Sequence, residues 1–243
     1  METLYQDIFK AFSSNPCLPE EKLARAHFER RIEELADMLA SEPLILFVLN
    51  ENKRHDAGSY NHMLRVGVEY DCIVNMYNRN IHNGIVGFVH DAGKMYVPKK
   101  ILQKPSGLTN EELKIMKCHN MLSMTVLKEL EPKYPGLTAI ALAHHLYPRT
   151  GSERRGRERR DIVFDLHFER RGGTDRRNGD RRKQNSVARF AGEILTICDI
   201  FDALSSPRTY KTAWSNSQIR EEIERKFGAH KDSINSLCII FSK

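Results

Sequence analysis

The apolar residues of this chain recur at the three- and four-residue spacing of an α-helix, and no segment shows the sustained alternation that is typical of a β-strand. Residues 20–40 carry such a stripe between many charged residues, as an amphipathic surface helix does. A second stripe contains His62, Val66 and Ile73. The last stripe consists of Val187, Phe190, Ile194, Ile197, Phe201 and Leu204. The pattern therefore predicts an all-α fold.

A further helix is predicted to begin after Thr109, because Thr109 and Glu112 have the spacing of a capping box. In a capping box, the side chain of each of the two residues accepts a hydrogen bond from the backbone N–H of the other. We expect one face of this helix to carry Ile115, His119, Leu122 and Val126.

The length and composition predict one main domain, because 243 residues of which 40% are hydrophobic can bury one substantial core. We expect this domain at residues 51–243, and at residues 1–50 a helical segment that packs on it or pairs with another subunit. No apolar run approaches the roughly 20 residues that cross a bilayer. The N-terminus also lacks a basic segment followed by an apolar one. We therefore predict a cytoplasmic protein without a membrane partner.

The five cysteines are scattered without a CxxC pair, which argues against a disulfide framework and against a cysteine zinc site. They are Cys17, Cys72, Cys118, Cys198 and Cys238. We expect them to be reduced and to serve mostly in packing.

The net charge of +6 is concentrated in one part of the chain. Residues 149–183 contain 13 Lys or Arg against 7 Asp or Glu, so the rest of the chain is balanced. We interpret residues 149–185 as an inserted loop, here called the Arg-rich insertion, with one short strand at 161–168. Its interleaved acids argue against a nucleic-acid partner, and an alternative interpretation is a solvated loop whose charges pair with one another.

Histidines and aspartates interrupt the apolar faces of five predicted helices. They are His62, His90 and Asp91 after the run 85–89, His119, His144 and His145 after the run 137–143, and Asp199. Any one of them is usually a core residue satisfied by a hydrogen bond, but together they favour a metal site. Imidazole and carboxylate ligands suit Mn, Fe or Zn, whereas Ca and Mg rely on oxygen. Gly93 is expected to let the chain turn out of the helix.

The order of these residues resembles the HD superfamily of metal-dependent phosphohydrolases, and within it the HD-GYP branch of cyclic di-GMP phosphodiesterases. The likeness runs from about Asp56 to Phe241. Its most specific part is His90-Asp91-Ala92-Gly93-Lys94, which matches the HDxGK motif. The other matches are Val97-Pro98, 101–105, Leu108-Thr109, Glu111-Glu112, 116–119, His144-His145, 199–204 and Arg208-Thr209-Tyr210. The resemblance implies an HD-type helical bundle around a buried metal centre.

The resemblance also implies two sets of metal ligands. One ion would be held by His62, His90, Asp91 and Asp199. A second would be held by His119, His144 and His145, with Asp91 bridging the two ions. Divalent iron or manganese in these positions would share a hydroxide that attacks a phosphorus atom of the substrate.

Two residues are implied in substrate binding. Lys94 would contact a phosphate oxygen and act beside Asp91 as a catalytic residue, whereas a solvated lysine after a helix end is the alternative interpretation. Arg208 would also bind the substrate.

Two departures from the family pattern bear on the function. Where HD-GYP proteins carry a Glu one helical turn before the first histidine, this chain has Gly58, so two metal ions are expected rather than three. The loop Leu146 to Ser152 lacks the GYP signature.

These departures leave two hypotheses. The first is a phosphodiesterase that hydrolyses a cyclic dinucleotide, with cyclic di-GMP as the leading candidate, in which arginines replace the lost recognition loop. The second is a signalling module that binds a nucleotide or docks a partner protein with little or no turnover. Pairing of two copies stays open under both.

Overall fold

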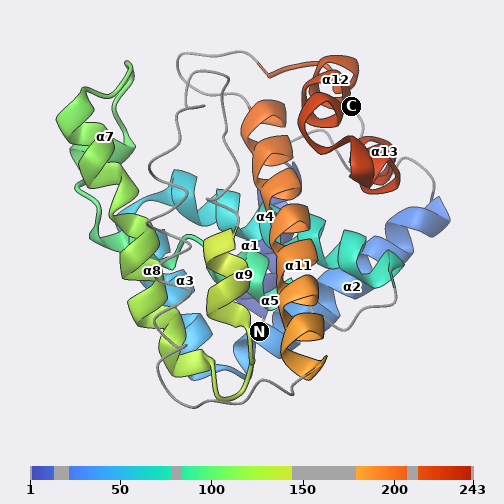
Figure 1. Cartoon of the computed structure of the whole chain (residues 1–243), viewed down its shortest axis with the longest axis horizontal. Helices are drawn as coiled ribbons and strands as arrows, with labels where there is room; N and C mark the ends of the chain where they lie inside the picture. Colours follow the sequence, from blue (N-terminus) through green and yellow to red (C-terminus); the bar gives the residue numbers. More distant parts are fainter. Residues whose placement is uncertain (1, 14–21, 78–83, 144–178, 207–212, 242–243) are drawn as a thin grey trace.

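The computed structural model describes residues 2–13, 22–77, 84–143, 179–206 and 213–241, and these residues form helices and connecting loops without a β-strand (Figure 1). The all-α prediction is confirmed. The α-helices are α1 (Glu2–Ser13), α2 (Lys22–Ala40), α3 (Pro43–His55), α4 (Ala57–Met76), α5 (Ile85–Val89), α6 (Lys99–Leu102), α7 (Asn110–Lys117), α8 (His119–Leu127), α9 (Leu137–Ala143), α11 (Gly179–Ser205), α12 (Asn216–Phe227) and α13 (Lys231–Ile240). The 3-10 helices are η2 (Ala92–Tyr96), η3 (Lys128–Leu130) and η5 (Gly228–His230).

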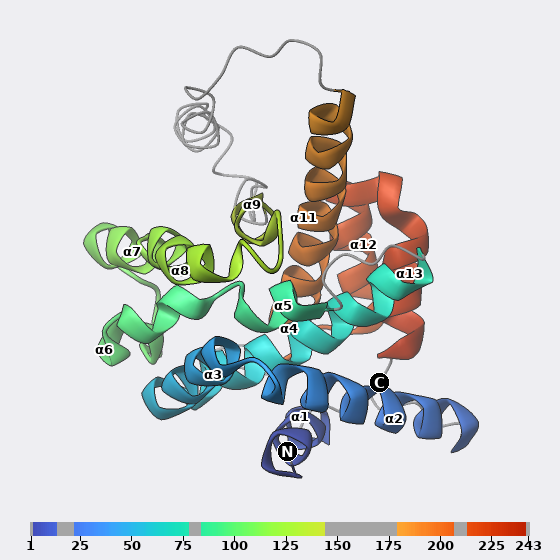
Figure 2. The ribbon, with the colours of Figure 1, turned by 90° about the horizontal axis from the view of Figure 1, so that it is seen from below.

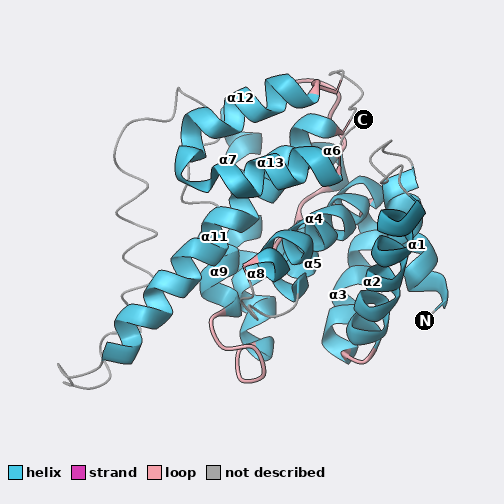
Figure 3. Ribbon diagram, turned by 90° about the vertical axis from the view of Figure 1, so that its right-hand side faces the viewer, coloured by secondary structure: helices cyan, strands magenta, loops and turns pink. Residues whose placement is uncertain are grey.

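Helices α4 and α11 lie at the centre of the fold. From Ser59 to Val74, α4 is buried on nearly all of its faces, and it packs against α1, α3, α5 and α11. Figure 2 shows α1, α2 and α3 together on one side of α4, while α12 and α13 pack against α11 (Figure 3). A helix enclosed in this way also carries its polar side chains into the interior, so each of them needs a partner.

The N-terminal helices share one hydrophobic core with the rest of the chain. This core includes Leu4 and Ile8 of α1 as well as Leu237 of α13, and Phe12 stacks on Phe241 with ring centroids 5.5 Å apart. The predicted boundary between residues 50 and 51 falls within α3. The division of the chain at this point stays a prediction.

Two glycines allow α4 and α5 to approach closely. A Cβ atom at Gly67 would lie 2.4 Å from the ring of Phe88, and one at Gly87 would lie 2.7 Å from the Cα atom of Gly67. Real Cβ atoms do not approach other atoms so closely, so larger residues would push the helices apart. The close packing brings the rings of His62 and His90 to a centroid distance of 5.4 Å.

The helix predicted after Thr109 is confirmed at its start and wrong in its continuation. Thr109 and Glu112 form the capping box before α7, with hydrogen bonds of 3.2 and 2.8 Å. The helix ends at Lys117, and α8 begins at His119. As a result Ile115 is 43% exposed while His119 is buried, so the predicted apolar face is not continuous. The first turn of α8 instead packs against η2, a tertiary contact that helical periodicity does not reveal.

Some predictions fall on residues outside the described part of the chain. These include Cys17, the strand at 161–168 and residues 149–178 of the Arg-rich insertion, whereas residues 179–185 form the first turns of α11. The other four cysteines are free thiols. Within the described ranges, no helix is both long enough and apolar enough to span a bilayer.

Candidate metal centre

His62 of α4 and Asp199 of α11 meet between the two central helices. The Nε2 atom of His62 lies 3.1 Å from Oδ1 of Asp199. Both side chains are buried. The apolar residues on the same helical faces, such as Val66 and Phe201, are buried as well, and their packing directs the polar pair into the interior.

His90 and Asp91 follow the buried run of α5. The chain passes there from the α-helix into η2, and both residues are 1% exposed. The Nε2 atom of His90 lies 3.2 Å from Oδ2 of Asp91, and the same oxygen lies 3.5 Å from Nε2 of His62. A carboxylate removed from water in this way requires positively charged or hydrogen-bonding partners.

His119 reaches the same carboxylate from the start of α8. Its Nε2 atom lies 3.1 Å from Oδ1 of Asp91. Gly93 allows this approach, because a Cβ atom there would lie 2.1 Å from the backbone oxygen of His119. The expectation that Gly93 turns the chain out of a helix is wrong: the α-helix already ends at Val89, and Gly93 lies within η2. The glycine is required by the neighbouring helix.

The three histidines turn the same ring nitrogen, Nε2, toward Asp91, and each is held by a hydrogen bond at its other nitrogen. Nδ1 of His62 lies 2.7 Å from Oδ2 of Asp202, Nδ1 of His90 lies 2.7 Å from the carbonyl oxygen of Gly87, and Nδ1 of His119 bonds to the carbonyl oxygen of Met116. Ionised carboxylates and carbonyls can only accept hydrogen bonds, so each Nδ1 carries the hydrogen. In the neutral rings each Nε2 therefore directs its lone pair inward.

This arrangement fits a divalent metal ion. A lone pair that points at a carboxylate oxygen is repelled unless a positive charge lies between them. One donor atom each from His62, His90 and Asp91 lie within 4.8 Å of one another. Imidazole nitrogen and carboxylate oxygen suit Zn, Mn or Fe, and an outward hydrogen bond from the other ring nitrogen is the usual arrangement of a metal-binding histidine.

The electrostatics of the centre also favour bound positive charge. Burial alone would lower the pKa of His62, but hydrogen bonds to three aspartates raise it to about 10. Burial raises the pKa of Asp91, yet Lys94 and the surrounding histidines hold it well below its usual range. The centre thus attracts cations, whether protons or metal ions.

Lys94 lies at the edge of the centre. It is in η2, three residues after Asp91, so the two side chains lie on the same side of a 3-10 turn. Its ammonium group pairs with Oδ2 of Asp91, and its side chain is 18% exposed. Lys94 can therefore reach both the buried carboxylate and the solvent.

The sequence prediction missed two buried residues, Asp202 and Arg65. Asp202 accepts hydrogen bonds from His62 and from the guanidinium of Arg65. Each of the two follows a predicted site residue by three positions, Arg65 after His62 and Asp202 after Asp199. Residues three positions apart lie on the same face of a helix, so Arg65 shares the face of His62 and Asp202 shares the face of Asp199. This spacing is the sequence signal that could have identified both residues.

Three predicted site residues, His144, His145 and Arg208, lie outside the described residues, as does the loop 146–152. The structure brings together His62, His90, Asp91, His119 and Asp199, with Lys94 beside them. The assignment of these residues as ligands stays a prediction.

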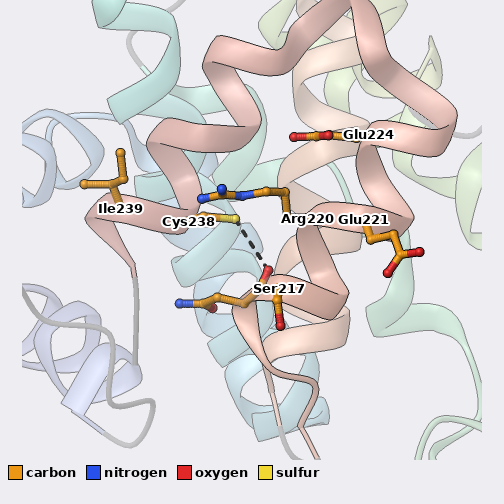
Figure 4. A pocket seen from close by; sticks show the side chains of 7 residues that line it. Ser217, Arg220, Glu221, Glu224, Cys238 and Ile239 are labelled. Atoms are coloured by element: carbon orange, nitrogen blue, oxygen red, sulfur yellow. Dashed lines mark hydrogen bonds between the residues drawn. The ribbon is translucent and has the colours of Figure 1, made fainter.

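A surface hollow of about 590 Å³ lies elsewhere, between α12 and α13 (Figure 4). Its lining includes Arg220, Glu221, Glu224 and Cys238. Burial raises the pKa of the Cys238 thiol, which keeps it protonated at neutral pH. Within the described part of the chain, none of the predicted site residues lines this hollow.

Comparison with curated proteins identifies several relatives, although no family model matches the chain. A 3'3'-cGAMP-specific phosphodiesterase of Vibrio cholerae is 30% identical over 142 residues, which make up 58% of this chain and 22% of that protein. A cyclic di-GMP phosphodiesterase of Pseudomonas aeruginosa is 25% identical over 197 residues, or 79% of this chain and 41% of that protein. A cyclic di-GMP phosphodiesterase of Thermotoga maritima is 30% identical over 141 residues, or 58% of this chain and 31% of that protein.

This chain spans less than half the length of each of these relatives. The similarity confirms the resemblance that the motifs predict. The chain is thus similar in sequence to bacterial phosphodiesterases of cyclic di-GMP and of 3'3'-cGAMP.

Proposed function

We propose that this protein is a metal-dependent phosphodiesterase that hydrolyses a cyclic dinucleotide, with cyclic di-GMP as its substrate. The observation that carries the proposal is the convergence of three histidine Nε2 atoms on the buried carboxylate of Asp91. The relatives support the substrate class, because their names specify cyclic di-GMP or 3'3'-cGAMP.

The proposed ligands form two groups around Asp91. His62 and His90 face Oδ2 of Asp91, and Asp199 contacts Nε2 of His62, whereas His119 faces Oδ1. Asp91 can thus serve both groups, with His144 and His145 completing the second. When bound there, two divalent ions, proposed to be iron or manganese, would activate water and neutralise charge on the phosphoryl oxygens.

Lys94 and Arg208 are proposed to bind the substrate. The Lys94 ammonium already lies at the mouth of the centre against Asp91, so a phosphate oxygen arriving there gains a charged hydrogen-bond donor. Arg208, in the segment after α11, would add a guanidinium group that can bind a phosphate in bidentate fashion or contact a guanine edge.

The missing GYP signature at 146–152 favours a second candidate function. In this alternative the same centre holds metal and binds a nucleotide or docks a signalling partner, with little turnover. Pairing of two copies and a cytoplasmic location stay predictions under both functions.

Chromatography of cyclic di-GMP incubated with the manganese- or iron-loaded protein tests the proposal. We expect the wild type to yield a linear dinucleotide or mononucleotides. The Asp91→Asn variant should yield neither, because it loses the central carboxylate. The matched control is Asp71→Asn, since Asp71 is equally buried in α4 but pairs with Arg31 away from the centre. Metal and nucleotide binding without product in the wild type would reject the enzyme and favour the binding module.

A further inference from the structure

Helices α4 and α11 face each other through two pairs of polar residues at matching spacing. His62 and Arg65 project from α4, and Asp199 and Asp202 project from α11. His62 contacts both aspartates, with Nε2 3.1 Å from Asp199 Oδ1 and Nδ1 2.7 Å from Asp202 Oδ2. One imidazole is therefore held from both sides, by Asp199 on the metal side and by Asp202 on the far side.

We propose that Asp202, clamped by Arg65, is a positioning residue that fixes the ring orientation and the protonated nitrogen of His62, and thereby sets the metal affinity of the centre. The inference rests on the proposed function, because it takes His62 as a metal ligand. It gives a role in the centre to two residues for which the family resemblance implied none.

The hydrogen bonds around Asp202 leave its carboxylate little freedom. The Nε atom of Arg65 donates to Oδ1, and a terminal nitrogen of the same guanidinium donates to Oδ2 at 3.1 Å. Ser206 also donates to Oδ1, at 3.2 Å. A forked guanidinium bond fixes the plane of a carboxylate. Asp202 is 1% exposed and Arg65 is 9% exposed, so water does not compete for these bonds.

The fixed carboxylate of Asp202 determines which ring nitrogen of His62 carries the hydrogen. Because Oδ2 of Asp202 can only accept, the neutral, metal-binding form of His62 must carry its one hydrogen on Nδ1, which leaves the Nε2 lone pair directed toward Asp91 and Asp199. Outer partners of this kind change metal affinity by about ten- to a hundredfold when they are replaced.

The competing explanation is that the Arg65–Asp202 pair only joins α4 to α11. The chain offers a matched control in Arg31 and Asp71. Arg31 binds the fully buried Asp71 of α4 through the same fork, at 2.7 and 2.8 Å. This pair joins α2 to α4, and it contacts none of the described histidines of the centre, His62, His90 and His119. If the Arg65–Asp202 pair had a purely structural role, disruption of either pair would change the metal affinity of the centre equally.

The test is titration with manganese(II) alone, with free metal measured by electron paramagnetic resonance, on the wild type, Asp202→Asn and Asp71→Asn. In Asp202→Asn, an amide N–H₂ must face either the Arg65 fork or Nδ1 of His62. If the amide N–H₂ faces Arg65, the hydrogen bonds from the guanidinium to residue 202 are lost. If it faces Nδ1, the hydrogen of the neutral His62 ring must move to Nε2. We expect the dissociation constant for manganese to rise about ten- to a hundredfold in Asp202→Asn and to stay unchanged in Asp71→Asn. Both variants should melt at lower temperature than the wild type.

An unchanged dissociation constant in Asp202→Asn, or an equal rise in both variants, would overturn the inference. If Asp202→Asn fails to fold, Arg65→Lys takes its place, because it keeps the positive charge but loses the forked hydrogen bond. This variant should also weaken manganese binding. Unchanged manganese binding in Arg65→Lys would overturn the inference as well. The visible spectrum of the cobalt(II)-loaded protein should change in the Arg65 and Asp202 variants and not in Asp71→Asn. A wild type that binds manganese but leaves cyclic di-GMP intact would refute the proposed function alone, whereas a wild type without metal would refute both.

Discussion

At the scale of single residues, the candidate centre depends on the hydrogen-bond partner behind each proposed ligand. Asp91 receives His62 and His90 at one oxygen and His119 at the other. Each ring is oriented by a hydrogen bond on its outer side, so in the neutral rings Nε2 is directed inward. Substitutions that shift these rings without removing them should therefore affect the centre.

Gly93 provides such a substitution. In Gly93→Ala, the new methyl group would lie 2.1 Å from the His119 backbone oxygen and 2.5 Å from the Ser123 nitrogen. Because both obstacles are backbone atoms of α8, the helix must shift, at an expected loss of about 1–3 kcal/mol in the free energy of unfolding. Urea unfolding measures this loss. In the control Gly107→Ala, no atom lies within 4 Å of the new methyl group, so stability should not fall. Equal stability of Gly93→Ala and the wild type would contradict the close packing of η2 and α8.

At the scale of elements, α4 carries His62 and begins at a charged cap. Asp56 accepts a hydrogen bond from the backbone N–H of Ser59 at 2.7 Å and one from the Gln103 amide at 3.0 Å. Burial alone would raise the pKa of Asp56, but these hydrogen bonds outweigh it and lower the pKa. The ionised cap therefore stabilises the start of α4.

Removal of this cap should have a pH-dependent effect. We expect Asp56→Ala to lower the free energy of unfolding by about 1 kcal/mol at neutral pH. A lowered pKa means that the contribution is complete above the unfolded value of about 3.9 and is lost as the pH falls through the lower folded value. The difference between wild type and variant should therefore shrink below about pH 4, as measured by urea unfolding across pH.

The control for this pH dependence is Ser215→Ala, which removes the cap of α12. The box there pairs Ser215 with Gln218, so neither side chain titrates in the acid range. Its effect should stay constant with pH. A constant effect of Asp56→Ala over the same range would contradict the role given to the ionised carboxylate.

The elements also show how far the sequence could predict the site. His62, His90, Asp91 and Asp199 could be found because each interrupts an apolar run or a recognisable motif. Arg65, by contrast, looks like an ordinary helix charge until the partner helix is known. Asp202 lay within the family motif but had no role until its hydrogen bonds to His62 and Arg65 were visible.

The break between α7 and α8 could not be predicted either, because it also depends on a contact with a distant segment of the chain. Helical periodicity is local, and it assigned Ile115 and His119 to one face. The orientation of His119 depends on the close approach of η2 at Gly93, which comes from an earlier segment of the chain. The tertiary contact between η2 and α8, and not the local periodicity, therefore determines how His119 is oriented.

At the scale of the whole molecule, the centre joins segments that are far apart in sequence. His62 lies in α4, Asp91 follows α5, His119 begins α8 and Asp199 lies in α11, so the side chains meet only when the full bundle has formed. All of these helices rest on the core that α1–α3 share. The proposed metal binding is therefore a property of the complete fold.

Metal content of the anaerobically purified protein, measured by inductively coupled plasma mass spectrometry, tests this account most directly. Supplied with manganese or iron, the wild type should hold about two divalent ions per chain. The double variant His90→Ala, Asp91→Ala should hold none. His230→Ala, which removes a histidine bonded to Glu193 outside the centre, should match the wild type. A wild type without metal, or a double variant that retains the full complement, would contradict the proposed centre.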